Sequence, residues 1–166
     1  MSDKPAGGSE DQSRPSDVYR SCPHEIRMDG DAVSSDRVMT GHFAVFNTWT
    51  TIRSFWEGEF LERIAPGAFA KTLKENARSI RVLLNHGSDP VLGDKPIGEI
   101  LSVGEDDIGV AYEVDLFRST PDLVIDGLRA GQYGASFRFQ VVREVIDQPE
   151  ESTEHNPERL PERTIT

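Results

Sequence analysis

Two side chains in this sequence have the types and surroundings that peptide hydrolysis needs. His86 follows the apolar run "IRVLL" and precedes the turn-forming residues "GSDP". Ser136 opens a later segment, "SFRFQV", in which apolar and polar residues alternate. A serine hydroxyl is a weak nucleophile unless a base removes its proton, and an imidazole, with an ordinary pKa of about 6.5, can do this near neutral pH. The two residues are therefore a candidate general base and nucleophile.

Each of the two also has a simpler structural interpretation. An isolated histidine at a strand end often bonds to the backbone of the next turn, and a small residue beside a helix end often fills space. Other chemistry is not indicated, because the four histidines are far apart in sequence, the one cysteine is Cys22, and neither metal-binding spacings nor a glycine-rich phosphate loop occurs. The sequence thus predicts no metal and no cofactor. From the residues alone, the expectation stops at a soluble α+β domain.

Several elements must position these two side chains. "VMTGHFAVFN" (38–47) is predicted as a strand, and "PGAFAKTLKENARS" (66–79) as a short helix, with Pro66 near its start and apolar residues at four-residue spacing. "IRVLLNH" (80–86) is predicted as a buried strand that ends at His86.

The second half of the domain has clearer signals. Residues 97–117 predict a hairpin around a polar turn, and apolar residues alternate in its second arm, so that one face points inward: Val110, Tyr112, Val114 and Leu116. Residues 119–133 predict a helix with Ser119 or Thr120 as its N-cap and Gly131 as its stop. The segment that follows, "GASFRFQVVREV" (134–145), is predicted as a strand, and Ser136 lies near its start.

Together these elements predict an α+β fold with a mostly antiparallel, barrel-like β core and two or more flanking helices. Residues 1–24 are rich in Ser, Asp, Pro and Gly, which predicts a disordered N-terminal arm. The folded domain is expected over residues 25–146. Residues 147–166 are acidic and proline-rich, which predicts a loop or tail that leads into a truncated strand.

Charge and composition restrict the partners. The 166-residue chain carries 18 Lys and Arg against 29 Asp and Glu, a formal net charge of -11. Such a charge repels phosphate backbones, so nucleic acid is not an expected partner. A single cysteine fits a reducing compartment. No signal peptide and no apolar run of about 18 residues is present, so neither export nor a membrane is expected.

Several segments occur in an order that resembles a known protein family: "GHFAVFN", "FLERIAPGAF", "LLNHGSDPVLGDKPIGEI", "DDIGVAYEVDL", "LRAGQYGASFRFQVV" and "RTIT". The sequence between residues 38 and 166 is similar to the prohead maturation proteases of tailed bacteriophages, the Hong Kong 97 type, which are distant relatives of the herpesvirus assemblins. "PGAF", "NH" and "SFRF" are the most specific parts of this resemblance.

The resemblance implies an activity and a place. It implies a serine endopeptidase with an assemblin-like fold, in which His86 is the general base and Ser136 the nucleophile. Its implied partners are the major capsid protein with its scaffold segment, and further copies of itself through self-cleavage and a homo-oligomer. The implied location is the host bacterial cytoplasm, inside the assembling procapsid.

The third catalytic residue is left open by the sequence. In the family, "RTI" leads into a further strand, and this strand could supply the third member beyond Thr166, in which case the chain as given could have low activity. Four residues within the chain are alternatives: Glu62, Glu99, Asp115 and His155. Family members often carry an acid directly after the histidine, whereas this chain has Gly87, and Asp89 lies two positions further on.

Three aromatic residues, Trp49, Phe55 and Trp56, are expected as core or loop anchors, with an aromatic substrate groove as the alternative. Arg138 shares the strand face of Ser136 and could line the site, although an outward-facing polar residue is the simpler interpretation. Two functional alternatives also remain: a catalytically inactive scaffold or binding module with the same fold, and a hydrolase of small esters.

Overall fold

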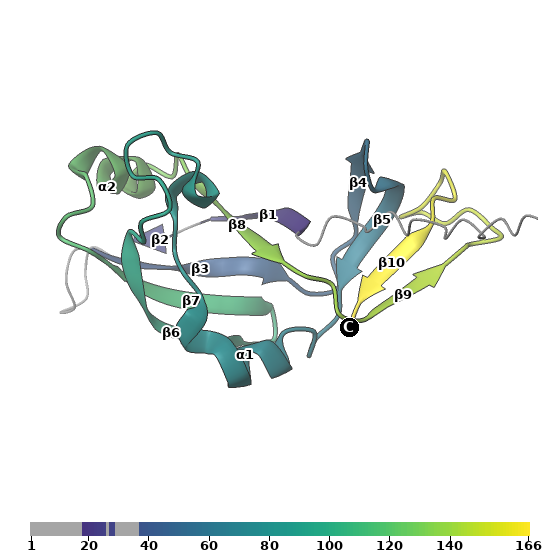
Figure 1. Cartoon of the computed structure of the whole chain (residues 1–166). Helices are drawn as coiled ribbons and strands as arrows, with labels where there is room; N and C mark the ends of the chain where they lie inside the picture. Colours follow the sequence, from purple (N-terminus) through teal and green to yellow (C-terminus); the bar gives the residue numbers. More distant parts are fainter. Residues whose placement is uncertain (1–17, 26, 29–36) are drawn as a thin grey trace, which may run out of the picture.

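The computed structural model describes residues 18–25, 27–28 and 37–166 and forms three sheets with short helices around them (Figure 1). A two-stranded ribbon pairs β1 (Val18–Glu25) with β8 (Gly134–Phe139). The central sheet has the order β2-β3-β7-β6: Arg27–Met28, Val38–Val45, Gly109–Leu116 and Gly98–Glu105. The C-terminal sheet has the order β4-β5-β10-β9: Thr50–Ser54, Gly58–Ile64, Glu162–Ile165 and Glu144–Asp147.

The central sheet contains the predicted hairpin. Strands β6 and β7 pair antiparallel around a turn at Asp106, whose carboxylate accepts the N–H groups of Ile108 and Gly109. In β7, Val110, Val114 and Leu116 are almost fully buried and Tyr112 is half-buried, which confirms the predicted inward face. Because side chains alternate along a strand, the apolar residues of β7 share one face, and both helices pack against this face.

The helices form where the sequence predicts them, with different ends. α1 (Ala70–Asn76) continues into the 3₁₀ turn η1 (Ala77–Ser79), and α2 covers Asp122–Arg129. The predicted N-cap of α2 is wrong: Pro121 is the capping position, and no side chain caps the helix. The hydroxyl of Thr120 instead donates to the carbonyl of Ile97, which ties the helix start to the central sheet.

Two clusters of buried side chains make the core. One joins α2 to the central sheet: Met39, Ile97, Val114, Leu116, Val124, Ile125 and Leu128. The other joins the start of α1 to both the central and the C-terminal sheet: Ala44, Phe46, Ile64, Phe69, Val110 and Ile165. The second cluster matters for the candidate site, because Phe137 and Phe139 of β8 pack against it.

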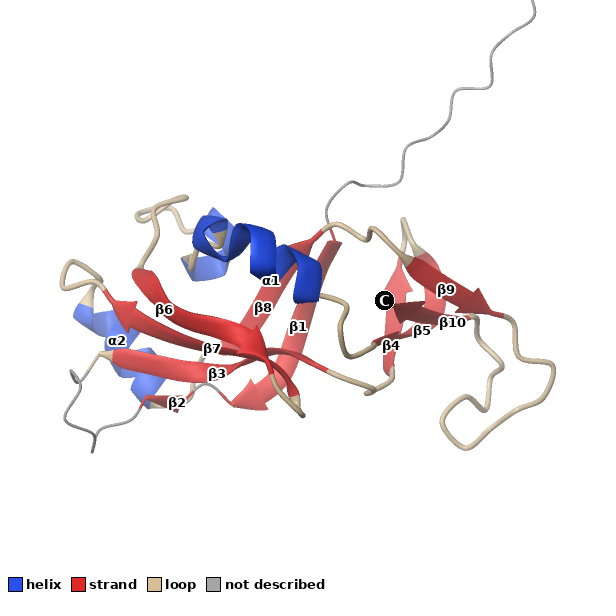
Figure 2. Cartoon of the chain, turned by 90° about the horizontal axis from the view of Figure 1, so that it is seen from below, coloured by secondary structure: helices blue, strands red, loops and turns tan. Residues whose placement is uncertain are grey.

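The α+β class is confirmed, but a closed barrel is not formed. β3 and β7 pair within the central sheet, while β1 pairs with β8 as a separate ribbon, so no continuous ladder surrounds the core. Figure 2 shows the C-terminal sheet set apart from the central sheet, at the opposite end of the molecule from α2. Among the described strands, pairing is antiparallel except between β5 and β10, which run parallel, and an isolated parallel bridge joins Phe46 to Ile64.

The predicted N-terminal arm extended to residue 24, and its residues 1–17 lie outside the described part of the chain. Val18–Glu25, however, is strand β1. Residues 18–24 are therefore part of a strand and not of an arm: Val18 is buried, and Arg20 pairs with Glu62 of β5.

A polar cluster joins β1 to the C-terminal sheet. The guanidinium groups of Arg20 and Arg163 both contact the buried carboxylate of Glu62, at 2.5 and 3.2 Å, and Glu57 and Glu144 complete the cluster. Burial by itself would lower the pKa of Arg20, but the hydrogen bonds that it donates to Glu62 and Glu57, together with the charges of these carboxylates, outweigh burial, so this pKa is raised above its ordinary value.

Candidate active site

The structure brings His86 and Ser136 together. Oγ of Ser136 lies 2.6 Å from Nε2 of His86, a hydrogen bond between residues fifty positions apart. Ser136 is exposed and His86 is half-buried. When Nε2 carries no proton, the hydroxyl donates to it, which is the geometry that general-base removal of the serine proton requires.

Strand β8 positions Ser136 by alternation. Phe137 and Phe139 point into the second core cluster, where their rings lie 5.8 and 6.2 Å from the ring of Phe69. Because neighbouring side chains on a strand point to opposite faces, Ser136 and Arg138 are left exposed on the other face. The aromatic anchors thus fix the direction of the candidate nucleophile.

His86 is held by a turn, so the predicted buried strand over residues 80–86 is wrong. Only Val82 makes a bridge, to Gly98, and Leu84–Gly87 is the 3₁₀ turn η2. Asn85, His86 and Gly87 all have left-handed backbone, with φ of 46, 52 and 85°. The apolar residues of the run, Ile80, Val82, Leu83 and Leu84, are half-buried, and the ladder ends after one bridge before the chain reverses direction.

The turn after His86 is stabilised locally. The carboxylate of Asp89 accepts the N–H groups of Val91 and Leu92, at 2.9 and 2.8 Å. Such a side-chain turn closes the loop on itself. Asp89 therefore has a local structural contact, and it stabilises the segment from which His86 projects.

Tyr19 lies against the candidate pair, and the sequence did not predict it. Its ring meets the ring of His86 edge to face, with centroids 4.9 Å apart and an interplanar angle of 87°. In the β1–β8 register Tyr19 is opposite Arg138, and Ser21 is opposite Ser136. Tyr19 falls in the polar segment predicted as disordered, and the apolar pair Val18-Tyr19 within that segment was the one available signal.

Arg138 reaches the candidate pair through Tyr19. Its guanidinium donates to the phenol oxygen of Tyr19 at 3.3 Å and lies 6.0 Å from the ring centre. The expectation that Arg138 shares the face of Ser136 agrees with the alternation along β8.

The four alternatives for a third member lie at different places in the fold. Glu62 is buried between Arg20 and Arg163. His155 bonds through Nε2 to Glu162, at 2.9 Å, and stacks on Trp49. The other two, Glu99 and Asp115, are exposed and lie opposite one another on β6 and β7.

The three aromatic residues singled out by the sequence lie in or beside the β4–β5 hairpin. Trp49 is covered on one side by His155 and on the other by the guanidinium of Arg63, at 4.4 Å. Phe55 and Trp56 occupy the turn between β4 and β5, pack edge to face, and are 92% and 81% exposed.

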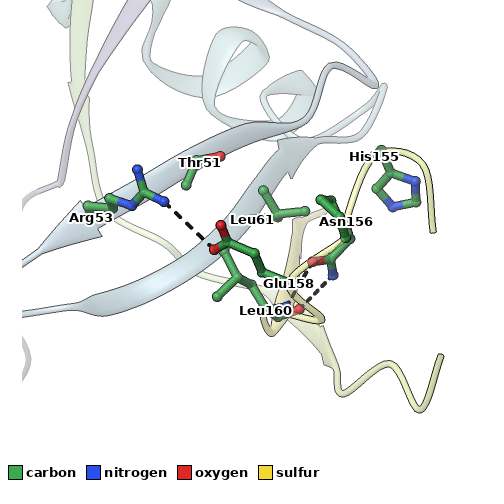
Figure 3. A pocket seen from close by; sticks show the side chains of 8 residues that line it. Thr51, Arg53, Leu61, His155, Asn156, Glu158 and Leu160 are labelled. Atoms are coloured by element: carbon green, nitrogen blue, oxygen red, sulfur yellow. Dashed lines mark hydrogen bonds and ion pairs between the residues drawn. The ribbon is translucent and has the colours of Figure 1, made fainter. Parts of the chain in front are cut away.

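The C-terminal sheet also has a small hollow of about 110 Å³, shown in Figure 3. It is lined by residues of β4, β5 and the loop before β10: Thr51, Arg53, Leu61, His155, Asn156, Pro157, Glu158 and Leu160. Asn156 is buried there and bonds to both the N–H and the carbonyl of Leu160, which closes the loop on itself. Neither His86 nor Ser136 lines this hollow.

The described residues contain neither a metal-binding cluster nor a membrane-spanning helix. Residues 18–25, 27–28 and 37–166 contain no group of three or more His, Cys, Asp or Glu side chains that could hold a metal ion. Among the same residues, no helix has the length and apolarity to cross a membrane.

Comparison with known proteins gives one match. A family model described as the caudovirus prohead serine protease matches residues 24–166, which is most of the chain and includes both residues of the candidate pair. Neither the curated proteins nor the solved structures give a significant match.

Proposed function

The chain belongs to the caudovirus prohead serine protease family, and from this premise we propose that it is a serine endopeptidase with Ser136 as nucleophile and His86 as general base. The observation that carries the assignment is the 2.6 Å contact between Oγ of Ser136 and Nε2 of His86. General-base catalysis needs the two heavy atoms within about 2.6 to 3.2 Å.

The first half of the proposed reaction forms an acyl-enzyme. Nε2 of His86 takes the hydroxyl proton as Oγ of Ser136 attacks the carbonyl carbon of the scissile peptide bond. The protonated His86 then gives this proton to the leaving nitrogen, so the bond breaks and the new amine departs. Proton transfer of this kind contributes roughly 10² to 10⁴ in rate.

The second half releases the acid product. His86, again unprotonated, takes a proton from water, and the hydroxide attacks the ester carbonyl on Ser136. The proton returns from Nε2 to Oγ, which regenerates the enzyme. Both side chains reach solvent, so water and a polypeptide segment can approach them. The proposed cycle uses no cofactor.

The proposed substrate is the scaffold segment of the major capsid protein, together with the protease itself. The family description, a prohead serine protease, supports a role in capsid maturation within the assembling procapsid of the host cell. The net charge of -11 disfavours binding to packaged nucleic acid and leaves protein as the expected partner.

The proposal is tested with a fluorophosphonate probe, which phosphonylates activated serines, and by intact mass. We expect the purified chain to gain one probe mass at Ser136, and we expect Ser136→Ala and His86→Gln to gain none. Ser119→Ala, which removes another exposed serine, is the matched control and should label like the wild type.

Incubation with the phage's capsid protein, scaffold attached, identifies the substrate class. Fragments that appear with the wild type and not with Ser136→Ala support the endopeptidase. Cleavage of an activated ester without any peptide cleavage would indicate the small-ester hydrolase instead. Absence of labelling, ester cleavage and peptide cleavage would favour the inactive scaffold or binding module.

A further inference from the structure

One face of the β1–β8 ribbon carries more of the candidate site than the pair itself. Ser136 and Arg138 lie on this face of β8, and the register places Ser21 and Tyr19 opposite them on β1. Residues directly opposite in an antiparallel pair point to the same side of the sheet. Tyr19 therefore stands beside Ser136 on the surface over which His86 packs.

His86 needs an element that fixes its ring. It projects from a turn with left-handed backbone, and its imidazole can rotate about two side-chain bonds. The hydrogen bond to Ser136 fixes one atom of the ring, Nε2, but does not by itself fix the ring plane. In serine proteases an acid commonly supplies this second restraint.

The edge-to-face contact with Tyr19 supplies such a restraint. The ring centroids are 4.9 Å apart at 87°, a favoured geometry for aromatic pairs, and rotation of the imidazole would lose it. Tyr19 is restrained in turn, because Arg138 donates to its hydroxyl. Tyr19 thus contacts both His86 and Arg138. Arg138 in turn lies two residues after Ser136 on the same face of β8.

We propose that Tyr19 is a positioning residue that holds the His86 ring with Nε2 directed at Ser136. This inference rests on the proposed protease function of the same pair. It assigns a catalytic contribution to β1, a strand that contains neither member of the pair.

The test compares two substitutions at Tyr19 that differ in one feature. Tyr19→Leu removes the ring, and we expect fluorophosphonate labelling of Ser136 to slow about tenfold, because a misdirected base is costly to the reaction rate. Tyr19→Phe keeps the ring and loses only the bond from Arg138, so labelling should stay within about threefold of wild type. Phe55→Leu is the control, since the ring of Phe55 contacts Trp56.

A peptide substrate separates positioning from binding. For Tyr19→Leu we expect kcat to fall about tenfold with KM nearly unchanged, and for Tyr19→Phe we expect kcat to recover. Equal labelling rates for Tyr19→Leu and the wild type would overturn the inference while leaving the function of Ser136 intact. A Tyr19→Phe rate as low as that of Tyr19→Leu would also overturn it.

Histidine-selective NMR gives a readout that does not depend on activity. The His86 ring signals, assigned with His86→Gln, should shift in Tyr19→Leu and return close to wild type in Tyr19→Phe, because the neighbouring ring current is lost and restored. Identical His86 signals in all three proteins would contradict the inference, including the case in which Tyr19→Leu is too unstable for kinetics. No labelling of the wild type would contradict the proposed function itself.

Discussion

The turn that carries His86 depends on a single glycine. Gly87 has φ of +85°, and a Cβ added there would lie 3.3 Å from the Cα of Asp94, closer than ordinary van der Waals contact. Only glycine adopts such a backbone without cost. The acid that relatives often carry after the histidine is therefore not expected to fit this turn.

Substitution at Gly87 tests this at the residue level. We expect Gly87→Ala and Gly87→Asp to destabilise the protein by about 1 to 3 kcal/mol, from backbone strain and the contact with Asp94, and to slow labelling of Ser136. Gly104→Ala is the control, because a Cβ at Gly104 meets nothing within 4 Å. Urea unfolding gives the free energies, and a Gly87→Asp protein as stable as wild type would show that the turn adapts.

A second residue-level prediction concerns pH. The N–H of Gly109 and the ring of His42 hold the pKa of Asp106 below its ordinary value of 3.8. A carboxyl with a lowered folded pKa stabilises the fold above the unfolded pKa, and this stabilisation is lost as pH falls through the folded pKa. We expect Asp106→Asn to have a lower Tm than wild type at pH 6, and we expect the difference to disappear as the pH falls through the lowered pKa of Asp106 in the folded protein.

Thermal scans of both proteins from pH 6 to pH 2 check this. Asp107→Asn, which changes the neighbouring exposed carboxyl, is the control. A Tm difference that stays constant across the whole range would mean that the charge of Asp106 has no part in the stability of the β6–β7 turn.

At this scale the sequence predicted the His86 and Ser136 pair, and the fold places the two in contact. Their catalytic roles remain a prediction. Tyr19 was not predicted, because Val18 is its one apolar neighbour within a largely polar segment and its contacts, to His86 and Arg138, come from segments much later in the chain. Local composition does not record such distant partners.

Among the elements, the link between β1 and the C-terminal sheet depends on Glu62. Its carboxylate is 4% exposed and faces two arginines, Arg20 and Arg163. Removing this charge leaves Arg20 and Arg163 with only the more exposed carboxylates of Glu57 and Glu144, and breaking a buried ion pair commonly costs about 3 to 5 kcal/mol. Strand β1, which contains Tyr19, is therefore held against the C-terminal sheet by the buried ion cluster around Glu62.

We expect Glu62→Gln to lower the free energy of unfolding by about 3 kcal/mol, measured by urea denaturation. Glu59→Gln is the control, because Glu59 pairs with an exposed arginine on the same hairpin, and its loss should be much smaller. Similar losses in the two variants would contradict a buried role for Glu62.

Elements with strong local signals were predicted well, and those decided by distant contacts were not. The β6–β7 hairpin has both alternation and a polar turn, and it forms as predicted. The start of α1 depends on Glu105, which lies 36 positions after Phe69 in the sequence. The carboxylate of Glu105 accepts the N–H groups of Gly67 and Phe69. The segment before His86 looks like a strand in sequence, but its ladder ends at Val82 because the chain turns away.

At the scale of the whole molecule, the predicted barrel-like core is not confirmed as a closed barrel, because the number of strands does not determine whether a sheet closes. Antiparallel strands with inward faces are common to barrels and to open sheets. Here the strands divide into three sheets, and the ribbon of β1 and β8 lies against β3 without joining the hydrogen-bonded ladder of the central sheet. The α+β class follows from the elements, whereas their division into sheets follows from contacts between distant segments.

Truncation tests the weight of β1. Removal of residues 1–17 keeps every contact described above, so we expect the Tm and the labelling rate of the wild type. Removal of residues 1–25 deletes Tyr19, Arg20 and the partner strand of β8, so we expect a cooperative loss of stability and no labelling. Circular dichroism melts give the Tm of the two truncated proteins, and fluorophosphonate labelling gives their activity. A folded and active chain of residues 26–166 would contradict the role given to β1.

The long separation between β1 and β8 has a consequence for timing. Tyr19 and Arg138 are 119 positions apart, so the ribbon cannot close on a growing chain until almost all of the domain has left the ribosome. Chain closure over such a distance is slow compared with the formation of helices and the β6–β7 hairpin. A nascent chain would thus contain His86 before Ser136, the candidate nucleophile, has been synthesised, and the proposed proteolysis could begin only once β8 has paired with β1.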